Sequence, residues 1–245
     1  MKKLLLILIP IFLISCSESK LLLKSLNQFQ APLNYVHDSK IINHDKSAKL
    51  AIKQTNFQSL NTLTSVSKIN HKLFPFIIYN YEEINLAVKL GQSSLQENYP
   101  DFFKNAFATE SERTGCYLLS DNINESDYSL EITCDTCKVE SKYQRNCTVV
   151  FLLFAYSMSF QEIGFPAETN LLLNVKLNKG DNLVFEKKYQ VYTAQPFLNV
   201  QRRNQVKLRA DFVTNMAESL SLSTKNGIEQ MIADINNAIK KNSAN

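Results

Sequence analysis

The sequence predicts an α+β domain behind an N-terminal export segment, and three patterns support this fold class. Runs rich in aromatic and β-branched residues recur between positions 73 and 192, as expected for strands. Apolar residues at three- and four-residue intervals predict amphipathic helices over 95–107 and 204–241. Two of the strand-like runs flank the turn-forming residues 178–182, which predicts a β-hairpin. Strands and helices together in one chain indicate the α+β class.

The N-terminus has the pattern of a signal peptide. Two lysines precede an apolar run over 4–13, which is too short to match the roughly 20 residues that span a bilayer as a helix. The tetrapeptide that follows, Leu-Ile-Ser-Cys16, resembles the lipobox of bacterial lipoproteins. The resemblance implies that residues 1–15 are removed and that the Cys16 thiol receives a diacylglyceryl group. Several acyl chains form a stable anchor, so the mature protein is expected to be held at a membrane without spanning it.

Residues 16–48 are expected to be a tether between this anchor and the domain. They are polar and weakly periodic, they contain Pro32, and they hold one short predicted helix over 21–29. Residues 49–245 are then a single α+β domain, long enough to bury a core.

Four cysteines remain once Cys16 carries lipid. They are Cys116, Cys134, Cys137 and Cys147. An even number in an exported chain favours two disulfides, of which three connectivities are open. The Cys134–Cys137 spacing also suits a zinc knuckle or a redox pair, but it lies in a strand-like run and no second pair of cysteines completes a zinc set. We therefore expect structural disulfides, no metal and no cofactor.

The first part of the domain has clear patterns in some segments and none in others. Residues 49–72 follow neither a helical nor a strand period. The dense apolar run 73–81 predicts the first core strand, and 84–93 predicts a weaker strand or a loop. The helix that follows has start and stop signals in Pro100 and Gly115, and its aromatic stripe is expected to face the core.

The middle of the domain holds the most apolar stretch of the mature chain. A short strand is predicted over 116–120, and a second over 127–133 that continues through the cysteine pair to Tyr143. Residues 149–166 have two interpretations: a buried strand or packed hairpin, or a segment that dips into lipid or lines an acyl cavity. For the second interpretation, the candidate lipid contacts are Phe151, Leu152, Phe154 and Phe160.

The C-terminal part combines the hairpin with a long helix. Apolar positions over 204–241 stay within one stripe, which predicts one helix or two that break near 226–227. Basic residues gather between the hairpin and this helix and include Arg202 and Arg203. They are either a solvated rim or contacts for anionic lipid or lipopolysaccharide phosphates, which suit the bidentate geometry of arginine.

This order of elements, with the strand Ser126-Asp-Tyr-Ser-Leu130, resembles a group of small envelope lipoproteins. The group includes the transport-auxiliary lipoproteins of lipid ABC systems and the lipopolysaccharide-assembly lipoprotein. The resemblance implies a two-layer sandwich, in which an amphipathic helix and a long C-terminal helix cover a mixed, mostly antiparallel sheet. It also implies action by binding partners or lipids. The cysteines between 134 and 147 depart from these families.

Composition and motifs point away from catalysis and nucleic acid. The formal net charge is +4, and two of the lysines lie in the signal peptide, which gives no basis for nucleic-acid binding. The three histidines lie at 37, 44 and 71, so a serine or cysteine nucleophile in the predicted core region would lack its usual base.

The expected function is that of a non-enzymatic lipoprotein that assists lipid or lipopolysaccharide transport or assembly. Its expected partners are the membrane, through the lipid anchor, and an envelope protein or lipid. Ser17 after the lipidated cysteine favours the outer membrane, with the domain in the periplasm. The alternatives are a surface-exposed adhesin or antigen, and a thiol-redox or metal protein that uses Cys134 and Cys137.

Overall fold

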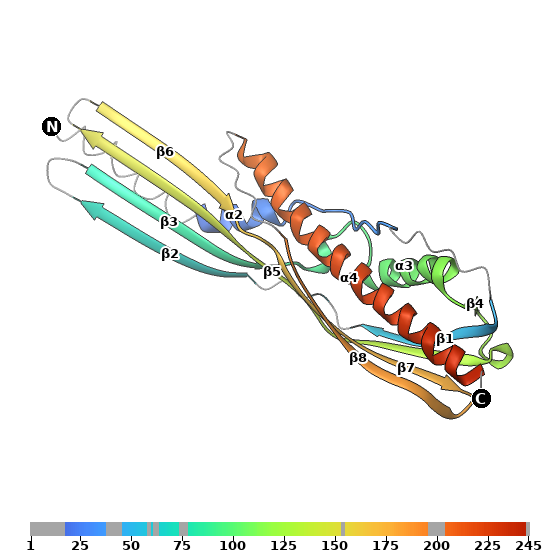
Figure 1. Ribbon diagram of the computed structural model, residues 1–245. Coiled ribbons are helices and arrows are strands. Elements are labelled where there is room, and N and C mark those ends of the chain that lie inside the picture. The colour runs from blue at the N-terminus through green and yellow to red at the C-terminus, as the bar shows by residue number, and fades with distance from the viewer. Residues whose placement is uncertain are drawn as a thin grey trace.

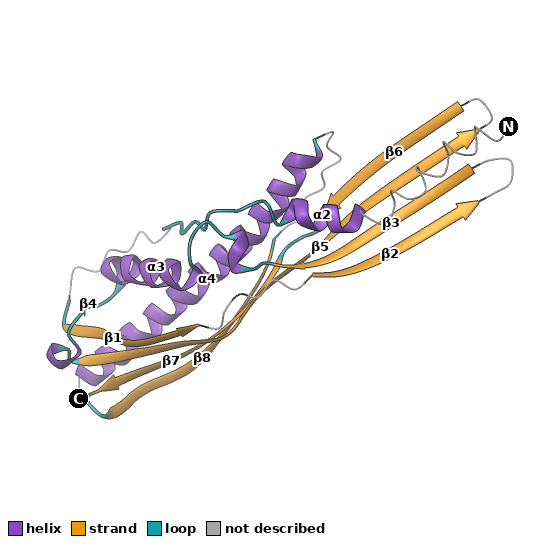
Figure 2. Ribbon diagram, turned by 180° about the vertical axis from the view of Figure 1, so that it is seen from behind, coloured by secondary structure: helices purple, strands orange, loops and turns teal. Residues whose placement is uncertain are grey.

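The computed structural model describes residues 18–37, 46–57, 60, 64–73, 78–152, 155–195 and 204–243. The chain folds into a body of helices packed on a sheet, from which four strands extend as a long arm (Figure 1). Figure 2 shows from behind that the helices lie over the body and the base of the arm, while the far part of the arm consists of strands.

One strand, β5 (Tyr128–Leu152), joins the body to the arm. It has 25 residues and is therefore about 80 Å long at roughly 3.3 Å per residue. Its first half pairs with β1 and β7, and its second half pairs with β3 and β6. The strand predicted to end at Tyr143 thus continues for nine further residues, to Leu152.

The body contains five strands in the order β4-β1-β5-β7-β8. Beside β5 these are β1 (Ala48–Phe57), β4 (Tyr117–Ser120), β7 (Glu168–Lys179) and β8 (Asn182–Ala194). The strand β1 is parallel to β4 and β5, and the other pairs are antiparallel. The pairs of the arm are all antiparallel, so the whole sheet is mixed and mostly antiparallel, which confirms the predicted α+β class.

The β7–β8 hairpin has the predicted turn. Gly180 adopts a φ of 58°, a left-handed conformation that glycine accepts without steric cost. The pairing register shifts between Leu177 and Asn178, which is the bulge that breaks the apolar alternation of β8.

The arm contains four strands in the order β2-β3-β5-β6. Beside β5 these are β2 (Thr64–Leu73), β3 (Ile78–Lys89) and β6 (Ala155–Gly164). The prediction of a first core strand over 73–81 was wrong: Leu73 ends β2, Ile78 begins β3, and 74–77 lie outside the described residues. The weaker strand or loop predicted over 84–93 belongs to β3 as far as Lys89, where β3 ends.

Three described α-helices pack on this framework, together with two short 3-10 turns. They are α2 (Glu18–Leu26), α3 (Tyr99–Thr114), α4 (Gln205–Ser243), η2 (Gln92–Ser94) and η3 (Ile123–Glu125). The helix α4 is unbroken through Gly227. A Cβ at Gly227 would lie 3.2 Å from Leu173 Cδ1, so this glycine allows a close approach of helix and sheet and does not end the helix.

The aromatic stripe of α3 faces the core, as predicted. Tyr99, Phe103 and Phe107 are at most 1% exposed. The ring of Phe57 in β1 meets Phe103 edge-on, with 4.9 Å between the ring centroids. This contact ties α3 to the body sheet, with α3 and α4 in one layer and the strands in the other.

The expected tether is part of the folded domain. In α2, Leu22 and Leu26 are four residues apart on one helical face, and each is 2% exposed. Further along, Asn34 donates its backbone N–H to Ser221 Oγ of α4 at 3.1 Å, and His37 lies 2.9 Å from Glu110 of α3. The prediction of a loose segment was wrong for residues 18–37, because apolar positions at helical spacing and polar contacts dock it on α3 and α4.

Candidate functional site

The arm carries apolar side chains on the face that continues the helix-covered face of the body. Residues paired across antiparallel strands point to the same side, so Val149 shares a side with Met158. Phe151, two residues from Val149, and Phe160, two residues from Met158, lie on this same side. We call these four residues the apolar arm surface. Phe151, Met158 and Phe160 are 41%, 44% and 40% exposed.

Phe151, Met158 and Phe160 remain exposed, although the Arg145 guanidinium lies over the Phe160 ring at 5.2 Å from its centroid. Closer to the body, the same face of β3 is buried at Ile84 and Leu86, each 1% exposed. Figure 2 shows α2 and the start of α4 at the base of the arm. Exposed apolar side chains gathered on one surface mark a site of contact with a protein partner, ligand or membrane.

The structure tests the first of the two interpretations of residues 149–166. The segment is a hairpin, as predicted, in which the end of β5 pairs with β6. Full burial was wrong, because residues 157–161 are all exposed. Among the predicted lipid contacts, Phe151 and Phe160 lie on the apolar arm surface. Leu152 closes β5, but its side chain lies outside what the structure describes, as does Phe154. Sequence reasoning missed Val149 and Met158, although their two-residue spacing from Phe151 and Phe160 was the available signal.

A buried ionic cluster fixes the base of the arm. Glu162 of β6 accepts hydrogen bonds from Arg209 of α4, through Nε at 3.0 Å and Nη2 at 2.5 Å, and from the Tyr143 hydroxyl. Arg145 Nε lies 3.8 Å from the same carboxylate. We call Tyr143, Arg145, Glu162 and Arg209 the arm-base cluster. Burial, followed by the hydrogen bond to Glu162, raises the pKa of Tyr143 well above its usual value, so the hydroxyl stays protonated and donates.

The arm-base cluster also holds the N-terminal helix. Arg209 Nη1 donates to Ser25 Oγ of α2 at 3.0 Å. One guanidinium thus joins α2, α4 and β6, which are far apart in the sequence. Sequence reasoning did not find this cluster, because Glu162 and Arg209 are separated by 47 residues and lie on elements whose packing no local pattern reveals.

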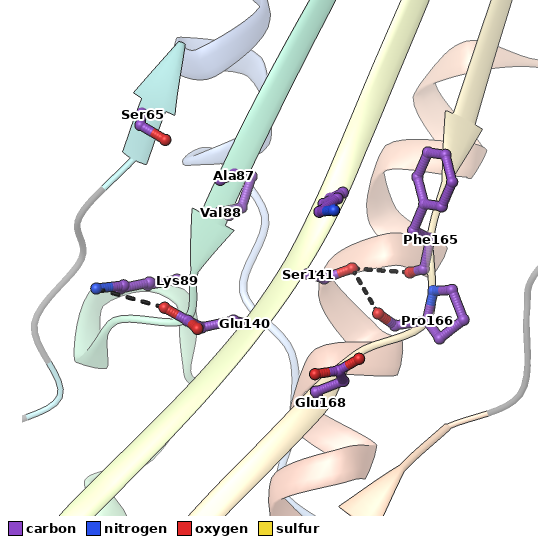
Figure 3. Close-up of a pocket in the computed structure, with 10 residues that line it drawn as sticks. Ser65, Ala87, Val88, Lys89, Glu140, Ser141, Phe165, Pro166 and Glu168 are labelled. Carbon is purple, nitrogen blue, oxygen red and sulfur yellow. Dashed lines mark hydrogen bonds and ion pairs between the residues drawn. The ribbon is translucent and has the colours of Figure 1, made fainter. Parts of the chain in front are cut away.

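A hollow of about 650 Å³ lies where the arm leaves the body (Figure 3). Its lining comes from β2, β3, β5, the β6–β7 connection and the start of β7: Ser65, Ala87, Val88, Lys89, Glu140, Ser141, Lys142, Phe165, Pro166 and Glu168.

Several polar groups at the hollow bind other groups of the protein. Lys89 and Lys138 lie 3.4 and 2.8 Å from the Glu140 carboxylate. Burial raises the pKa of Glu140, but hydrogen bonds from both lysines outweigh it, so the pKa lies below its usual value. Ser141 donates to the carbonyl oxygens of Phe165 and Pro166, and this bifurcated bond holds the β6–β7 connection in place. These contacts hold the strands together where the arm meets the body.

The structure holds the four described cysteines as thiols. Cys137 and Cys147 are ten residues apart on one strand, about 33 Å, which far exceeds the Cα separation of up to about 7 Å that a disulfide needs. Cys116 precedes Tyr117, the partner of Ala48, whereas Cys134 pairs with Phe57 at the other end of β1, about 30 Å away. The prediction of two disulfides was therefore wrong, because the extended strands separate the cysteines.

Only Cys134 and Cys137 lie together among these four. A bulge between Cys134 and Thr136 shifts the register, so that the two cysteines pair with Leu173 and Leu171 and share one face. A hydrogen bond with Cys134, followed by burial, raises the pKa of the Cys137 thiol. A redox nucleophile needs a lowered thiol pKa, so this environment is opposite to that of a thioredoxin-like centre. In the part of the chain that the structure describes, no group of three or more His, Cys, Asp or Glu side chains is arranged to hold a metal ion.

This geometry predicts the thiol content of the purified protein. When protein that has met no reductant is unfolded and alkylated, Cys116 and Cys147 should be labelled in every molecule, because no other described cysteine reaches them. Peptide mapping by mass spectrometry measures this. Cys134 and Cys137 are the internal comparison, since they alone are close enough to bridge. A bridge that includes Cys116 or Cys147 within one chain would contradict the strand register.

The remaining predicted residues lie outside the described part of the chain. These are Cys16, Arg202 and Arg203. The nearest described residues after the two arginines are Asn204, whose side chain accepts the Lys207 backbone N–H at 3.1 Å as a helix cap, and Lys207, whose side chain is exposed. None of the described helices combines the length and apolar character needed to cross a bilayer.

The fold is similar to that of a solved protein. The similar structure is protein XCC0632 from Xanthomonas campestris, which is described by family model DUF330. The TM-score is 0.51 at 12% sequence identity, and the match covers 88% of this chain and 98% of that one. At this identity the similarity concerns the fold alone. No family model matches the sequence, and no curated protein matches it.

Proposed function

We propose that this protein is a lipid-anchored accessory protein of the bacterial envelope, which assists lipid or lipopolysaccharide transport or assembly by contact and without catalysis. The observation that carries the proposal is the apolar arm surface. Three of its side chains are 40% or more exposed on a four-stranded arm that extends beyond the helices. Full burial of a side chain of this size from full exposure gains about 1.5–3 kcal/mol, so a partner that covers the exposed two fifths gains about 0.6–1.2 kcal/mol for each residue.

Two further observations support this proposal. The tetrapeptide Leu-Ile-Ser-Cys16, which spans the expected cleavage position, resembles a lipobox, and a lipid on Cys16 would place the domain beside a membrane. The order of elements resembles that of the lipid-transport auxiliary and lipopolysaccharide-assembly lipoproteins, and the fold is similar to a DUF330 protein over most of both chains. Ser17 after Cys16 favours the outer membrane with the domain in the periplasm.

The anchor is tested by replacing its attachment site. Cys16→Ala should move the protein from the membrane fraction to the soluble fraction, because the thiol that receives the acyl chains is lost. Fractionation of cells with detection of the protein measures this, and separation of inner from outer membranes tests the proposed location. Cys147→Ala is the control, since it removes a cysteine elsewhere and should leave the protein on the membrane. Full retention of Cys16→Ala would show that lipid on this residue is not the anchor.

The contact role is tested by charging the apolar arm surface. The double variant Phe151→Asp and Met158→Asp should lose lipid or protein partners that co-purify with the wild-type chain from detergent extracts, because charged side chains oppose burial. Leu118→Asp and Tyr192→Asp, at body positions that are 52% and 61% exposed, form the matched control. Recovery of the wild-type protein alone and free of lipid would count against the proposal.

A further inference from the structure

The helix α2 restricts where a lipid on Cys16 can lie. Only Ser17 separates Cys16 from Glu18, the first residue of α2. Two residues span at most about 7 Å, so the Cys16 sulfur stays close to the start of this helix. The helix itself is docked, because its residue Ser25 is bound by Arg209 of the arm-base cluster.

The direction of α2 points this start toward the arm. After α2 the chain continues toward the body, where Asn34 binds Ser221 of α4. In Figure 1 the earlier, darker end of α2 faces the arm and its later end faces α4. A lipid on Cys16 therefore lies on the arm side of the molecule, opposite to the body.

Both the lipid position and the apolar arm surface lie on the arm side of the arm-base cluster. From Ser25 to Glu18 the helix rises about 10 Å, and the step to Cys16 adds up to about 7 Å. On the arm, Ser25 lies at the level of Glu162, which pairs with Arg145. Phe151 is six residues beyond Arg145 on β5, or about 20 Å. The acyl chains and the Phe151 ring are thus placed to enter the same layer.

We infer that the apolar arm surface inserts into the lipid leaflet that holds the Cys16 acyl chains. This inference rests on the proposed lipid anchor and adds the orientation of the anchored protein: the arm points into the membrane of attachment and the body points away from it. The acyl chains hold the protein at the surface, and the arm fixes its angle.

The side chains near this end suit a lipid surface. Leu21 of α2 and Val206 of α4 are 59% and 62% exposed. Three lysines are exposed on the same two helices, a basic set that attracts anionic headgroups: Lys20, Lys24 and Lys207. A leaflet is favoured over a protein partner because the anchor brings lipid to this surface in every molecule.

Fluorescence of a single introduced tryptophan tests this inference. The wild-type chain has no tryptophan, so all tryptophan emission comes from the introduced residue. Full-length, lipidated Phe151→Trp is reconstituted in phosphatidylethanolamine and phosphatidylglycerol vesicles, with and without bromine on the acyl chains. Met158→Trp repeats the measurement at a second position of the apolar arm surface. Tyr192→Trp on β8 is the control, at an exposed position of the body.

The expected result is a blue-shifted emission from Trp at 151 and 158, with several-fold stronger quenching by brominated lipid than at 192. Iodide in the water should quench mainly the tryptophan at 192. Equal iodide quenching at all three positions would overturn the inference. Protection of positions 151 and 158 from both quenchers would also overturn it, because a protein partner or a second copy would then cover the surface. Failure of the proteins to float with the vesicles would instead refute the proposed anchor before any fluorescence is read.

Discussion

Replacement of Arg209 by methionine should lower the free energy of unfolding by about 3 kcal/mol. Removing one partner of a buried ion pair leaves the other charge without compensation, which typically costs about 3–5 kcal/mol. Here Glu162 is buried, and it loses two hydrogen bonds from the guanidinium. Tyr143 and Arg145 remain beside the carboxylate, so we expect the lower end of this range. Denaturant unfolding of the purified variant measures the loss.

The cause of this loss can be separated from a loss of packing. The double variant Arg209→Met and Glu162→Gln removes both charges and keeps an acceptor for Tyr143, so it should be more stable than Arg209→Met alone. Lys207→Met is the control on the same helix: its side chain is exposed, and the change should stay within about 0.5 kcal/mol. If the double variant were as unstable as the single one, the ionic explanation would fail. Hydrogen exchange should rise in α2 and β6, the two elements that Arg209 joins to α4.

Phe103→Ala should destabilise the protein by about 3–5 kcal/mol, the usual cost of truncating a buried phenylalanine. Phe103 is fully buried and packs edge-on against Phe57 of β1 and Tyr99 of α3, so its removal leaves a cavity between helix and sheet. Thermal or denaturant unfolding measures the effect.

The matched control for this change is Phe151→Ala. It removes the same atoms from a ring that is 41% exposed on the arm, so it should cost well under half as much. A cost as large as that of Phe103→Ala would show that Phe151 is part of a core, which would remove the basis for a contact role. The comparison therefore separates aromatic residues that hold the fold from those that remain for a partner.

Fold class followed from local patterns because those patterns arise within single elements. The stripe of Tyr99, Phe103 and Phe107 has a helical period whether or not the sheet is known, and its burial is the simplest consequence of that period. The hairpin around Gly180 and the helical character of the C-terminal segment were predictable for the same reason, but the pattern left open a break near 226–227 that α4 does not have. The α2 helix was also predicted, but its docking was not, because two leucines on a short helix do not identify their neighbours.

The arm illustrates what local patterns miss. An apolar run such as 149–152 is expected inside a protein, since most such runs are buried. Whether it is buried depends on which elements cover it, and α2 and α4 reach only the base of the arm. The cysteines show the same limitation: counting them predicted two disulfides, but the length of β5 and β1 separates all except Cys134 and Cys137.

The sequence by itself determined the α+β class and the main helices, because each depends on residues close together in the chain. The export signal and the lipobox at Cys16 are local patterns of the same kind, and they stay predictions. Only the tertiary structure decided that residues 18–37 belong to the domain, that β5 extends into an arm, and that Arg209 joins three distant elements. These features depend on contacts between residues that are far apart in the sequence. The free energy of packing decides which elements come together, and no local period shows it. The candidate site is of this second kind: its apolar residues are visible in the sequence, but their exposure is a property of the fold.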